Sequence, residues 1–420
     1  MANARKTPVI IDTDPGVDDT VAILMALACP EIEILAFVVT FGNTDLDASY
    51  ANIFKIYQAV GREIEHDPLA AARFPNYFQA VKPIIVKGPS GPLSGEQHSA
   101  KYFHGRDGLG NMSEIHPDLN VPPEVVGAAE HSKLRPLLKP AHEVALDLLR
   151  SHAPREVTYI ALGPMTNLAL MMRTDARCVR ERIGRVVAMG GALDVPGNAT
   201  PVAEFNWYAD PYAVSELLHP APGAAHAGIP LSRTLILPLD ITTKHELPFP
   251  AYATHIDPTF VPHTPSVPDG KHPLRHFASA FLHRTRDVMR GFGKDALELH
   301  DITAVWTAAM VPPTPDKAGE KATKGEYTRG MCVVDRRDEA MAYASGVNRA
   351  KLQEDLIKAD AAYEGHRFES SAAPAPGHVQ DAATSASLLD GYEGVRIVRT
   401  TPGPDALLKL LFSRVWGVLI

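Results

Sequence analysis

The chain has 420 residues, 45% of them apolar, and a formal net charge of −8 at pH 7. This length suits two domains or one large α/β domain with insertions, and the apolar content is enough for a sizeable core. The negative charge and the lack of any basic run argue against a nucleic-acid-binding surface. No apolar run reaches the roughly 18 residues that a membrane span requires, so we expect no membrane partner.

The cysteines and the chain ends bear on the compartment. Cys29, Cys178 and Cys332 have neither metal-ligand spacing nor an obvious pairing, which fits a reducing compartment. Residues 1–7 are too short and polar for a signal peptide. We therefore expect a cytoplasmic protein, and we interpret the apolar tail at 407–420 as a docked helix and not as an anchor.

The acidic stretch at 12–19 is the most informative part of the chain. Its four carboxylates lie where the apolar run 8–11 ends and the helical pattern 21–27 begins, which is the carboxyl end of a strand. Like charges this close repel, so they must be well solvated or neutralised by a cation. Capping a helix needs only one carboxylate. Because all the donors are hard oxygens, the pattern favours a calcium or magnesium site.

Strand-like and helix-like segments alternate along most of the chain. This alternation predicts an α/β fold with an open, mostly parallel sheet and helices on both faces, in a single domain. The predicted strands are residues 8–11, 32–40, 82–88, 157–162, 185–189, 234–239, 330–335 and 394–400. The predicted helices are residues 21–27, 47–60, 141–150, 166–173, 212–218, 276–291, 304–309 and 404–413.

Other segments lack a clear period. Residues 61–81 are irregular, and 88–112 form a Gly-rich loop that holds His98 and His104. The segments 117–140 and 339–385 are typical of insertions, the latter partly disordered. Residues 248–273, rich in Pro, Thr and His, have the composition of a loop that covers a site.

The motif Asp-Thr-Asp-Pro-Gly-Val-Asp-Asp at 12–19 resembles the amino-terminal signature of the inosine–uridine-preferring nucleoside hydrolase family. Residues 104–110 are similar to the active-site loop of that family. Further similar segments follow in the family's order and cover most of the chain, at 161–168, 189–191, 197–206, 210–211 and 300–301. The resemblance implies the Rossmann-like nucleoside hydrolase fold.

The resemblance also implies a metal site. Asp14, Asp19 and Asp301 would give three carboxylates to one Ca²⁺, and the backbone carbonyl of Leu162 would join them. These protein oxygens leave calcium short of its usual about six to eight ligands, so water and two ribose hydroxyls complete the shell. Such a cation lowers the pKa of its bound water. Asp14 is then the expected base, since it would touch both the ion and the water.

A second set of residues would bind the nucleoside. Carboxylates and amide oxygens around a ribose stabilise the positive charge that develops when an N-glycosidic bond breaks. The departing base needs an acid, for which His300 is the first candidate and His104 the second. The predicted substrate-binding residues are Asp18, Asn43, Met189, Asn198, Glu204, Phe205, Asn206 and Asp301.

The leading hypothesis is a calcium-dependent hydrolase that cleaves ribonucleosides to ribose and free base, in nucleoside catabolism or in purine and pyrimidine salvage. We also expect a homo-oligomer, a dimer or tetramer. One alternative is a non-catalytic, calcium-dependent binder of nucleosides or ribose. Another is a magnesium-dependent phosphatase with Asp12 and Asp14 as nucleophile and acid, because Asp-x-Asp after a strand also suits aspartyl-phosphate chemistry.

Overall fold

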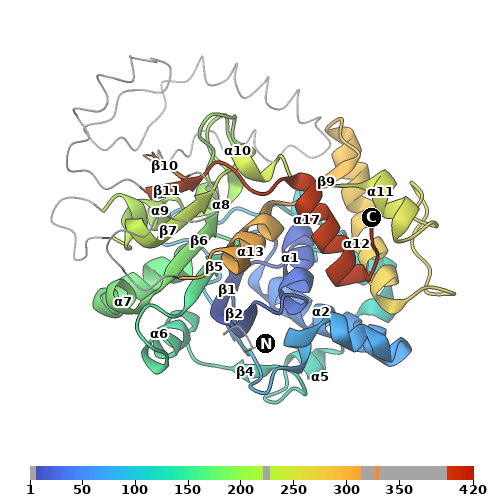
Figure 1. The fold of residues 1–420 in the computed structure, drawn as a ribbon, viewed down its shortest axis with the longest axis horizontal. Coiled ribbons are helices and arrows are strands. Elements are labelled where there is room, and N and C mark those ends of the chain that lie inside the picture. The colour runs from blue at the N-terminus through green and yellow to red at the C-terminus, as the bar shows by residue number, and fades with distance from the viewer. Residues whose placement is uncertain (1–5, 221–227, 314–326, 331–394) are drawn as a thin grey trace.

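A computed structural model describes residues 6–220, 228–313, 327–330 and 395–420. The described strands form a nine-stranded sheet in the order β10-β11-β7-β6-β5-β1-β2-β3-β4 (Figure 1). Its pairs are parallel except for β10 with β11, so the predicted open, mostly parallel sheet is confirmed. The strands are β1 (Thr7–Thr13), β2 (Ile32–Val39), β3 (Ile84–Lys87), β4 (Arg135–Leu137), β5 (Thr158–Ala161), β6 (Arg185–Met189), β7 (Thr234–Leu237), β10 (Tyr327–Gly330) and β11 (Val395–Val398).

β1 lies inside the sheet, between β2 and β5, and all of its residues are buried. Val9 and Ile11 pack into the core on one face of the sheet, and Ile10 packs into the core on the other. A strand covered on both faces reads as a continuous apolar run, which is why the sequence predicted it correctly. The same strand delivers Asp12 and Asp14 to its carboxyl end.

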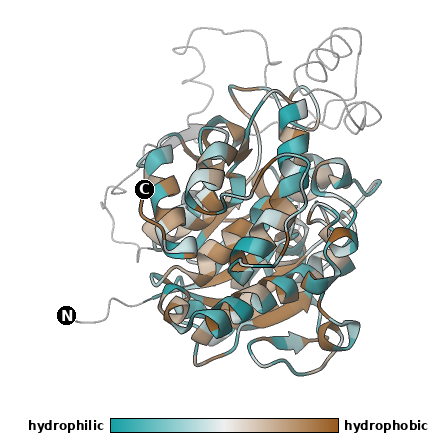
Figure 2. Ribbon diagram, turned by 90° about the vertical axis from the view of Figure 1, so that its right-hand side faces the viewer, coloured by the Kyte–Doolittle hydropathy of each residue, from teal (hydrophilic) through white to brown (hydrophobic). Residues whose placement is uncertain are grey.

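Helices cover both faces, as predicted, with outer surfaces that are mainly hydrophilic around apolar strands (Figure 2). No helix in the described ranges is both long and apolar enough to cross a bilayer. Helices of one face are α1 (Val17–Leu27), α2 (Leu46–His66), α12 (Pro273–Gly291), α13 (His300–Met310) and α17 (Pro404–Leu411). Helices of the other face are α6 (Ala141–Ser151), α7 (Thr166–Arg182) and α9 (Pro211–Leu218).

Some segments differ from the prediction. The helix predicted at 47–60 continues to His66, and 3-10 helices η1 (Pro68–Arg73) and η2 (Pro75–Phe78) follow where we expected irregular chain. The loop predicted at 248–273 was wrong at its start. Strand β8 (Glu246–Pro248) leads directly into α11 (Phe249–His255), whose Phe249 and Tyr252 are buried. A proline at the second position of a helix is compatible with helix geometry, so Pro250 does not block α11.

The stretch 117–140 contains β4, which pairs in parallel with β3 and forms one edge of the main sheet. The insertion predicted at 339–385 lies outside the described residues, and so does the predicted strand 330–335 except for Gly330, the last residue of β10. The predicted docked tail is confirmed, since α17 and the π-helix η5 (Phe412–Trp416) bury Leu407, Leu411 and Phe412.

Glu63 joins three elements of the fold and supplies a test of it. Its carboxylate accepts from Arg73 Nη2 at 2.7 Å and from the Leu274 backbone N–H at 3.2 Å, and the residue is 3% exposed. Replacing Glu63 with alanine removes the carboxylate partner of the largely buried Arg73, which keeps only the Val415 carbonyl as an acceptor. We expect the free energy of unfolding to fall by about 3 kcal/mol in urea titrations. The matched control is Glu181→Ala, which removes an exposed pair with Arg177 and should change stability by less than about 0.5 kcal/mol. Equal losses in the two variants would contradict the structural role of Glu63.

Candidate active site

A cavity opens at the carboxyl ends of the central strands. Asn43 follows β2, Leu162 follows β5, and Met189 ends β6, while Asp18 and Asp301 lie in the first turns of α1 and α13. This is the edge at which open parallel sheets bind ligands. The cavity is lined by Asp18, Asn43, Ala100, Tyr102, Phe103, His104, Leu162, Met189, Asn198, Glu204, Phe205, Asn206, Met289, Phe292, Leu297, Glu298, His300 and Asp301. It therefore brings together every predicted site residue except Asp14 and Asp19, both of which are fully buried.

Asp19 is fixed in the turn between β1 and α1. Its Oδ1 accepts from the Thr13 hydroxyl at 2.6 Å, and its Oδ2 accepts from the Gly16 backbone N–H at 3.1 Å. The side-chain amide of Asn43 donates to the same Oδ2 at 2.8 Å. Asn43, which sequence reasoning predicted as a sugar ligand, therefore also orients an acidic side chain beside the cavity.

Asp14 has one oxygen held and one oxygen free of hydrogen bonds. The Asn43 backbone N–H donates to Oδ2 at 2.7 Å, whereas the buried Oδ1 has no partner within the described parts of the chain. Two glycines approach this carboxylate so closely that a Cβ on Gly163 would overlap Oδ1 and one on Gly42 would overlap Oδ2. The absence of side chains at these two positions is thus what makes room for Asp14.

Asp18, Asp19 and Asp301 form a buried cluster. One carboxylate oxygen from each lies within 4.8 Å of the others. Burial raises the pKa of Asp301 well above its usual range, and the charges of Asp18 and Asp19 raise it further. Burial likewise raises the pKa of Asp18 to about 7. Ionised carboxylates this close need a compensating positive charge, and a set of hard oxygens fits calcium or magnesium.

The predicted metal set and this cluster overlap without being identical. Asp19 and Asp301 belong to both, while Asp18, predicted as a sugar ligand, takes the place of Asp14 in the compact group. Asp14 is nevertheless close enough for its charge to raise the pKa of Asp301. Asp14 Oδ1 also has no hydrogen-bond partner in the described parts of the chain. The buried carboxylates of Asp14, Asp18, Asp19 and Asp301 therefore form a set of oxygen donors that fits a divalent cation.

The segment 198–206 forms a hydrogen-bonded wall of the cavity. Glu204 caps α8 (Phe205–Ala209), since its Oε1 accepts from the Asn206 backbone N–H at 2.8 Å and its Oε2 from that of Gly191 at 3.0 Å. Asn198 Oδ1 accepts from the Phe205 backbone N–H at 2.8 Å. The Asn206 side-chain amide donates to the Leu162 carbonyl at 2.7 Å. Capping explains the contacts of Glu204 with α8, and the side chains of Glu204, Asn198 and Asn206 also line the cavity.

The two candidate acids have different environments. His300 Nδ1 lies 2.8 Å from the Thr242 hydroxyl, and its Nε2 lies 3.2 Å from Glu298 Oε2. His104 Nδ1 accepts from the Val17 backbone N–H at 3.1 Å, and burial lowers the pKa of His104 to about 3. His104 is therefore neutral near pH 7 with its proton on Nε2, whereas His300 is paired with a carboxylate.

Asp12 is buried behind the site. Its oxygens accept from the Tyr159 hydroxyl at 2.7 Å and from the Asn167 side-chain amide at 2.9 Å. Burial raises the pKa of Asp12 to about 7, and both hydrogen bonds oppose that rise. Both Asp12 oxygens are occupied by these hydrogen bonds and the residue does not line the cavity, which argues against the alternative in which it attacks a phosphate.

Part of the cavity wall was missed by the sequence analysis. The segment 248–273 was expected to cover the site, yet it contributes no lining residue. The apolar wall instead comes from Tyr102 and Phe103, before His104, and from Met289 and Phe292 at the end of α12. The aromatic pair beside the 104–110 motif was a usable signal. Nothing in the pattern of 276–291 distinguishes its last turn from an ordinary buried helix.

Comparisons with known proteins identify a matching family and several relatives. The sequence model of the inosine-uridine preferring nucleoside hydrolase family matches residues 9–359 of this chain. A probable uridine nucleosidase 2 from Oryza sativa subsp. japonica is 35% identical over 206 residues, which cover 49% of this chain and only 51% of that protein. The pyrimidine-specific ribonucleoside hydrolase RihA of Salmonella arizonae is 30% identical over 340 residues, which cover 78% of this chain and 88% of that protein.

Solved structures show the same fold. A plant nucleoside hydrolase superimposes with a TM-score of 0.62 over 98% of this chain and 99% of its own, at 22% sequence identity. An inosine-guanosine nucleoside hydrolase gives the same TM-score at 20% identity, over 98% and 99% of the two chains. At these identities the likeness establishes the fold alone.

Gly163 lies against the Asp14 carboxylate, so adding a side chain at this position tests the role of Asp14. Alanine at Gly163 would place a methyl group on Asp14 Oδ1 and displace the carboxylate. We expect Gly163→Ala to weaken Ca²⁺ binding by at least about tenfold in calorimetric titrations, since the predicted ligand Asp14 would be misplaced. Gly91→Ala is the matched control, because no atom lies within 4 Å of a Cβ at that position. If the two alanine variants, both shown to be folded by circular dichroism, bind calcium equally, Asp14 does not hold the ion.

Proposed function

Because the chain belongs to the inosine–uridine-preferring nucleoside hydrolase family, we propose that it hydrolyses the N-glycosidic bond of ribonucleosides to ribose and a free base. The observation that carries this proposal is the buried floor of the cavity. There the carboxylates of Asp18, Asp19 and Asp301 cluster close to Asp14, one oxygen of which has no hydrogen bond in the described parts of the chain. Amide groups and aromatic rings form the walls of the cavity above them.

We propose Ca²⁺ as the cofactor, held by Asp14, Asp19, Asp301 and the carbonyl of Leu162. When bound, such an ion supplies Lewis-acid chemistry, lowering the pKa of water and orienting ribose hydroxyls. The all-oxygen donor set supports calcium or magnesium over zinc. The ability of calcium to take more ligands at longer distances favours it over magnesium where a sugar must also bind.

Asp14 is the proposed general base. Its Oδ2 is held by the Asn43 backbone N–H, which leaves Oδ1 to accept a proton from the attacking water. Burial raises the pKa of Asp14, so its ionised carboxylate takes up a proton more readily than that of an exposed aspartate. Gly42 and Gly163 leave the room that this carboxylate occupies.

The wall around the sugar would stabilise the transition state. Asp18 and Glu204 bring negative charge, and Asn43, Asn198 and Asn206 bring amide groups to the same cavity. Positive charge that develops on the anomeric carbon and ring oxygen is stabilised by such fixed groups. Their hydrogen bonds to the backbone hold them in place before the substrate binds.

The base would lie against the apolar side of the cavity. Tyr102, Phe103 and Phe292 offer aromatic surface for a flat ring, and His300 would donate a proton to it. Thr242 at Nδ1 and Glu298 at Nε2 occupy both ring nitrogens, so His300 must turn away from one of them to donate to the base. His104 is neutral, so we assign it a hydrogen-bonding role and not that of the main acid.

We further propose that the substrate is a free ribonucleoside of nucleoside catabolism or salvage, met in the cytoplasm. A dimer or tetramer remains our prediction from the resemblance. The two relatives above are named for uridine and for pyrimidine ribonucleosides, and one of the solved structures is named for inosine and guanosine. Uridine and cytidine are therefore the first substrates to test, followed by inosine and guanosine.

The first test combines turnover with metal removal. We expect release of base from at least one nucleoside, loss of that activity in chelator and its return with Ca²⁺. Asp14→Asn should lower kcat by about 10²–10⁴-fold, the usual contribution of a positioned general base. The exposed Asp47→Asn is the control and should retain parental activity. Nucleoside binding without any base release would support the non-catalytic alternative.

A second test addresses leaving-group protonation. We expect His300→Ala to reduce kcat for inosine or uridine by at least about a hundredfold. It should affect nitrophenyl riboside little, because that leaving group departs without a proton. Equal losses on both substrates would remove His300 from the acid role and assign it to binding or structure.

A further inference from the structure

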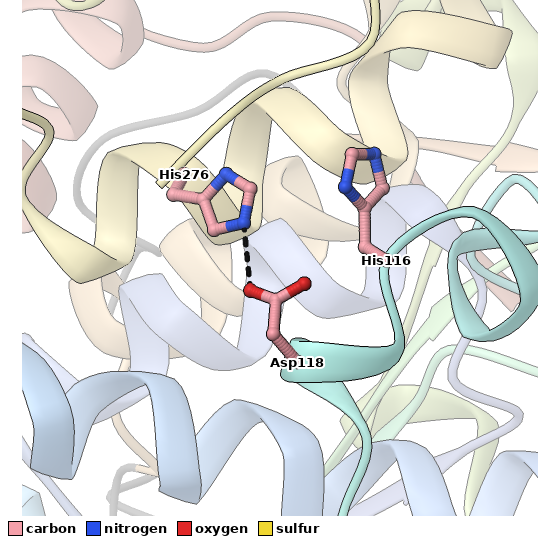
Figure 3. A group of neighbouring side chains, drawn as sticks. All are labelled: His116, Asp118 and His276. Atoms are coloured by element: carbon pink, nitrogen blue, oxygen red, sulfur yellow. Dashed lines mark hydrogen bonds and ion pairs between the residues drawn. The ribbon is translucent and has the colours of Figure 1, made fainter. Parts of the chain in front are cut away.

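Three potential metal ligands meet outside the active site, near the start of α12 (Figure 3). His116 follows the short helix α4 (Met112–Ile115), Asp118 lies in the 3-10 helix η3 (Pro117–Leu119), and His276 is in the first turns of α12. One ligand atom from each lies within 4.8 Å of the other two. Figure 3 shows the Asp118 carboxylate turned toward the His276 ring, with the His116 ring beside them.

We propose that His116, Asp118 and His276 form a second metal site, for a divalent transition-metal ion with Zn²⁺ as the best match. Two imidazole nitrogens and one carboxylate oxygen are a common ligand set for zinc, and they leave the fourth tetrahedral position open to water. Calcium prefers oxygen ligands alone, so this set selects a different ion from the one proposed for the active site. The proposal rests on this geometry and not on the proposed hydrolase activity.

His276 already has the support that zinc-binding histidines usually have. Its Nδ1 lies 2.9 Å from the Ser266 hydroxyl, while its Nε2 lies 3.0 Å from Asp118 Oδ2. A hydrogen bond at one ring nitrogen orients the ring and directs the other nitrogen toward the metal. Ser266 is itself held by Lys271 Nζ at 2.9 Å, so the ring orientation is determined by a network and not by a single contact.

His116 is a buried imidazole available to a metal. It is 5% exposed, and in the described part of the chain its ring contacts the His276 ring, with centroids 5.4 Å apart, without a hydrogen bond of its own. An imidazole without a proton on one ring nitrogen has a lone pair there to give to a cation.

Cationic side chains near the cluster are held by partners of their own. Lys271 Nζ lies 2.8 Å from Asp257 Oδ2, both side chains being buried, so its charge is balanced locally. Lys55 donates to Asn52 and Ser113, and Arg62 donates to the Asp118 carbonyl. These cations, with Asp118 and His276, line an adjacent cavity of about 210 Å³. An inorganic anion is the competing occupant of this cavity. However, the Lys and Arg side chains already donate hydrogen bonds to protein oxygens, and the Asp118 carboxylate would repel an anion.

A metal here would join the segment after the active-site loop to α12. Gly110, near the end of that loop, lies so close to α12 that a Cβ would be 2.9 Å from the Phe281 carbonyl, and Arg284 donates to the Tyr102 carbonyl at 3.2 Å. The proposed ion adds a third attachment at His276. Its role would be to fix the base of the loop against the helix.

The test uses the full chain without an affinity tag. The protein is stripped with a chelator, given excess Ca²⁺ to fill the carboxylate cluster, and then titrated with Zn²⁺. We expect the titrated protein to contain one zinc ion per chain when its metal content is measured by mass spectrometry. Co²⁺ in place of zinc should give the visible absorption of a four-coordinate site. Asp14→Asn should leave both results unchanged, which separates this site from the proposed active site.

Variants decide which residues bind the ion. Asp118→Asn, whose side chain is 48% exposed, should fold and should weaken zinc binding by at least about tenfold. His116→Gln should weaken it further, while the matched control His263→Gln, 80% exposed, should bind like the parent. Zinc binding that is absent, or unchanged in both Asp118→Asn and His116→Gln, would overturn the proposal. Binding of inorganic phosphate in place of zinc would overturn it as well.

Discussion

The structure depends on the burial of several aspartates at one end of β1. Asp12, Asp14, Asp18, Asp19 and Asp301 are all at most 9% exposed, and burial raises the pKa of each. Removing ionised carboxylates from water is unfavourable unless hydrogen bonds and opposite charge compensate. The hydrogen bonds are present around Asp12 and Asp19, whereas Asp14 keeps a free oxygen. The remaining compensation must come from protons or from a cation, so the proposed metal would stabilise the fold as well as supply its proposed chemistry.

This constraint extends to the ends of the neighbouring strands. Gly42 follows β2 and Gly163 follows β5, and both touch the Asp14 carboxylate. Gly42 has a φ of +152°, a conformation that residues with a side chain rarely adopt. Parallel pairing of β1 with β2 and β5 fixes how near these loops come to Asp14. The sheet register and the position of the proposed base are thus set by the same contacts.

Elements were predicted correctly from the sequence where the spacing of apolar residues matches the burial of those residues in the structure. β1 and β2 are covered on both faces, so their apolar runs are continuous, and the 12–19 motif identifies the site because its charges are too dense for capping alone. It failed for α11, where prolines suggested a loop, and for β4, a three-residue edge strand too short to show a period. The wall residues Met289 and Phe292 were missed because their role depends on where α12 ends in space. Long-range pairs such as His116 with His276 leave no local signal at all.

The two proposed metal environments differ in ligand chemistry, and this difference lets one chain keep two ions apart. The active-site cluster offers only carboxylate oxygens, which discriminate weakly among divalent ions but leave room for sugar hydroxyls. The cluster at the start of α12 replaces two of those oxygens with imidazoles, which hold zinc far better than calcium. His276 and the cavity residue Met289 are 13 residues apart on α12, which is about 20 Å along the helix axis. A structural ion at that distance acts on the substrate only through the position of the helix. It would therefore tune the apolar wall that receives the base and leave the carboxylates beneath the sugar unchanged.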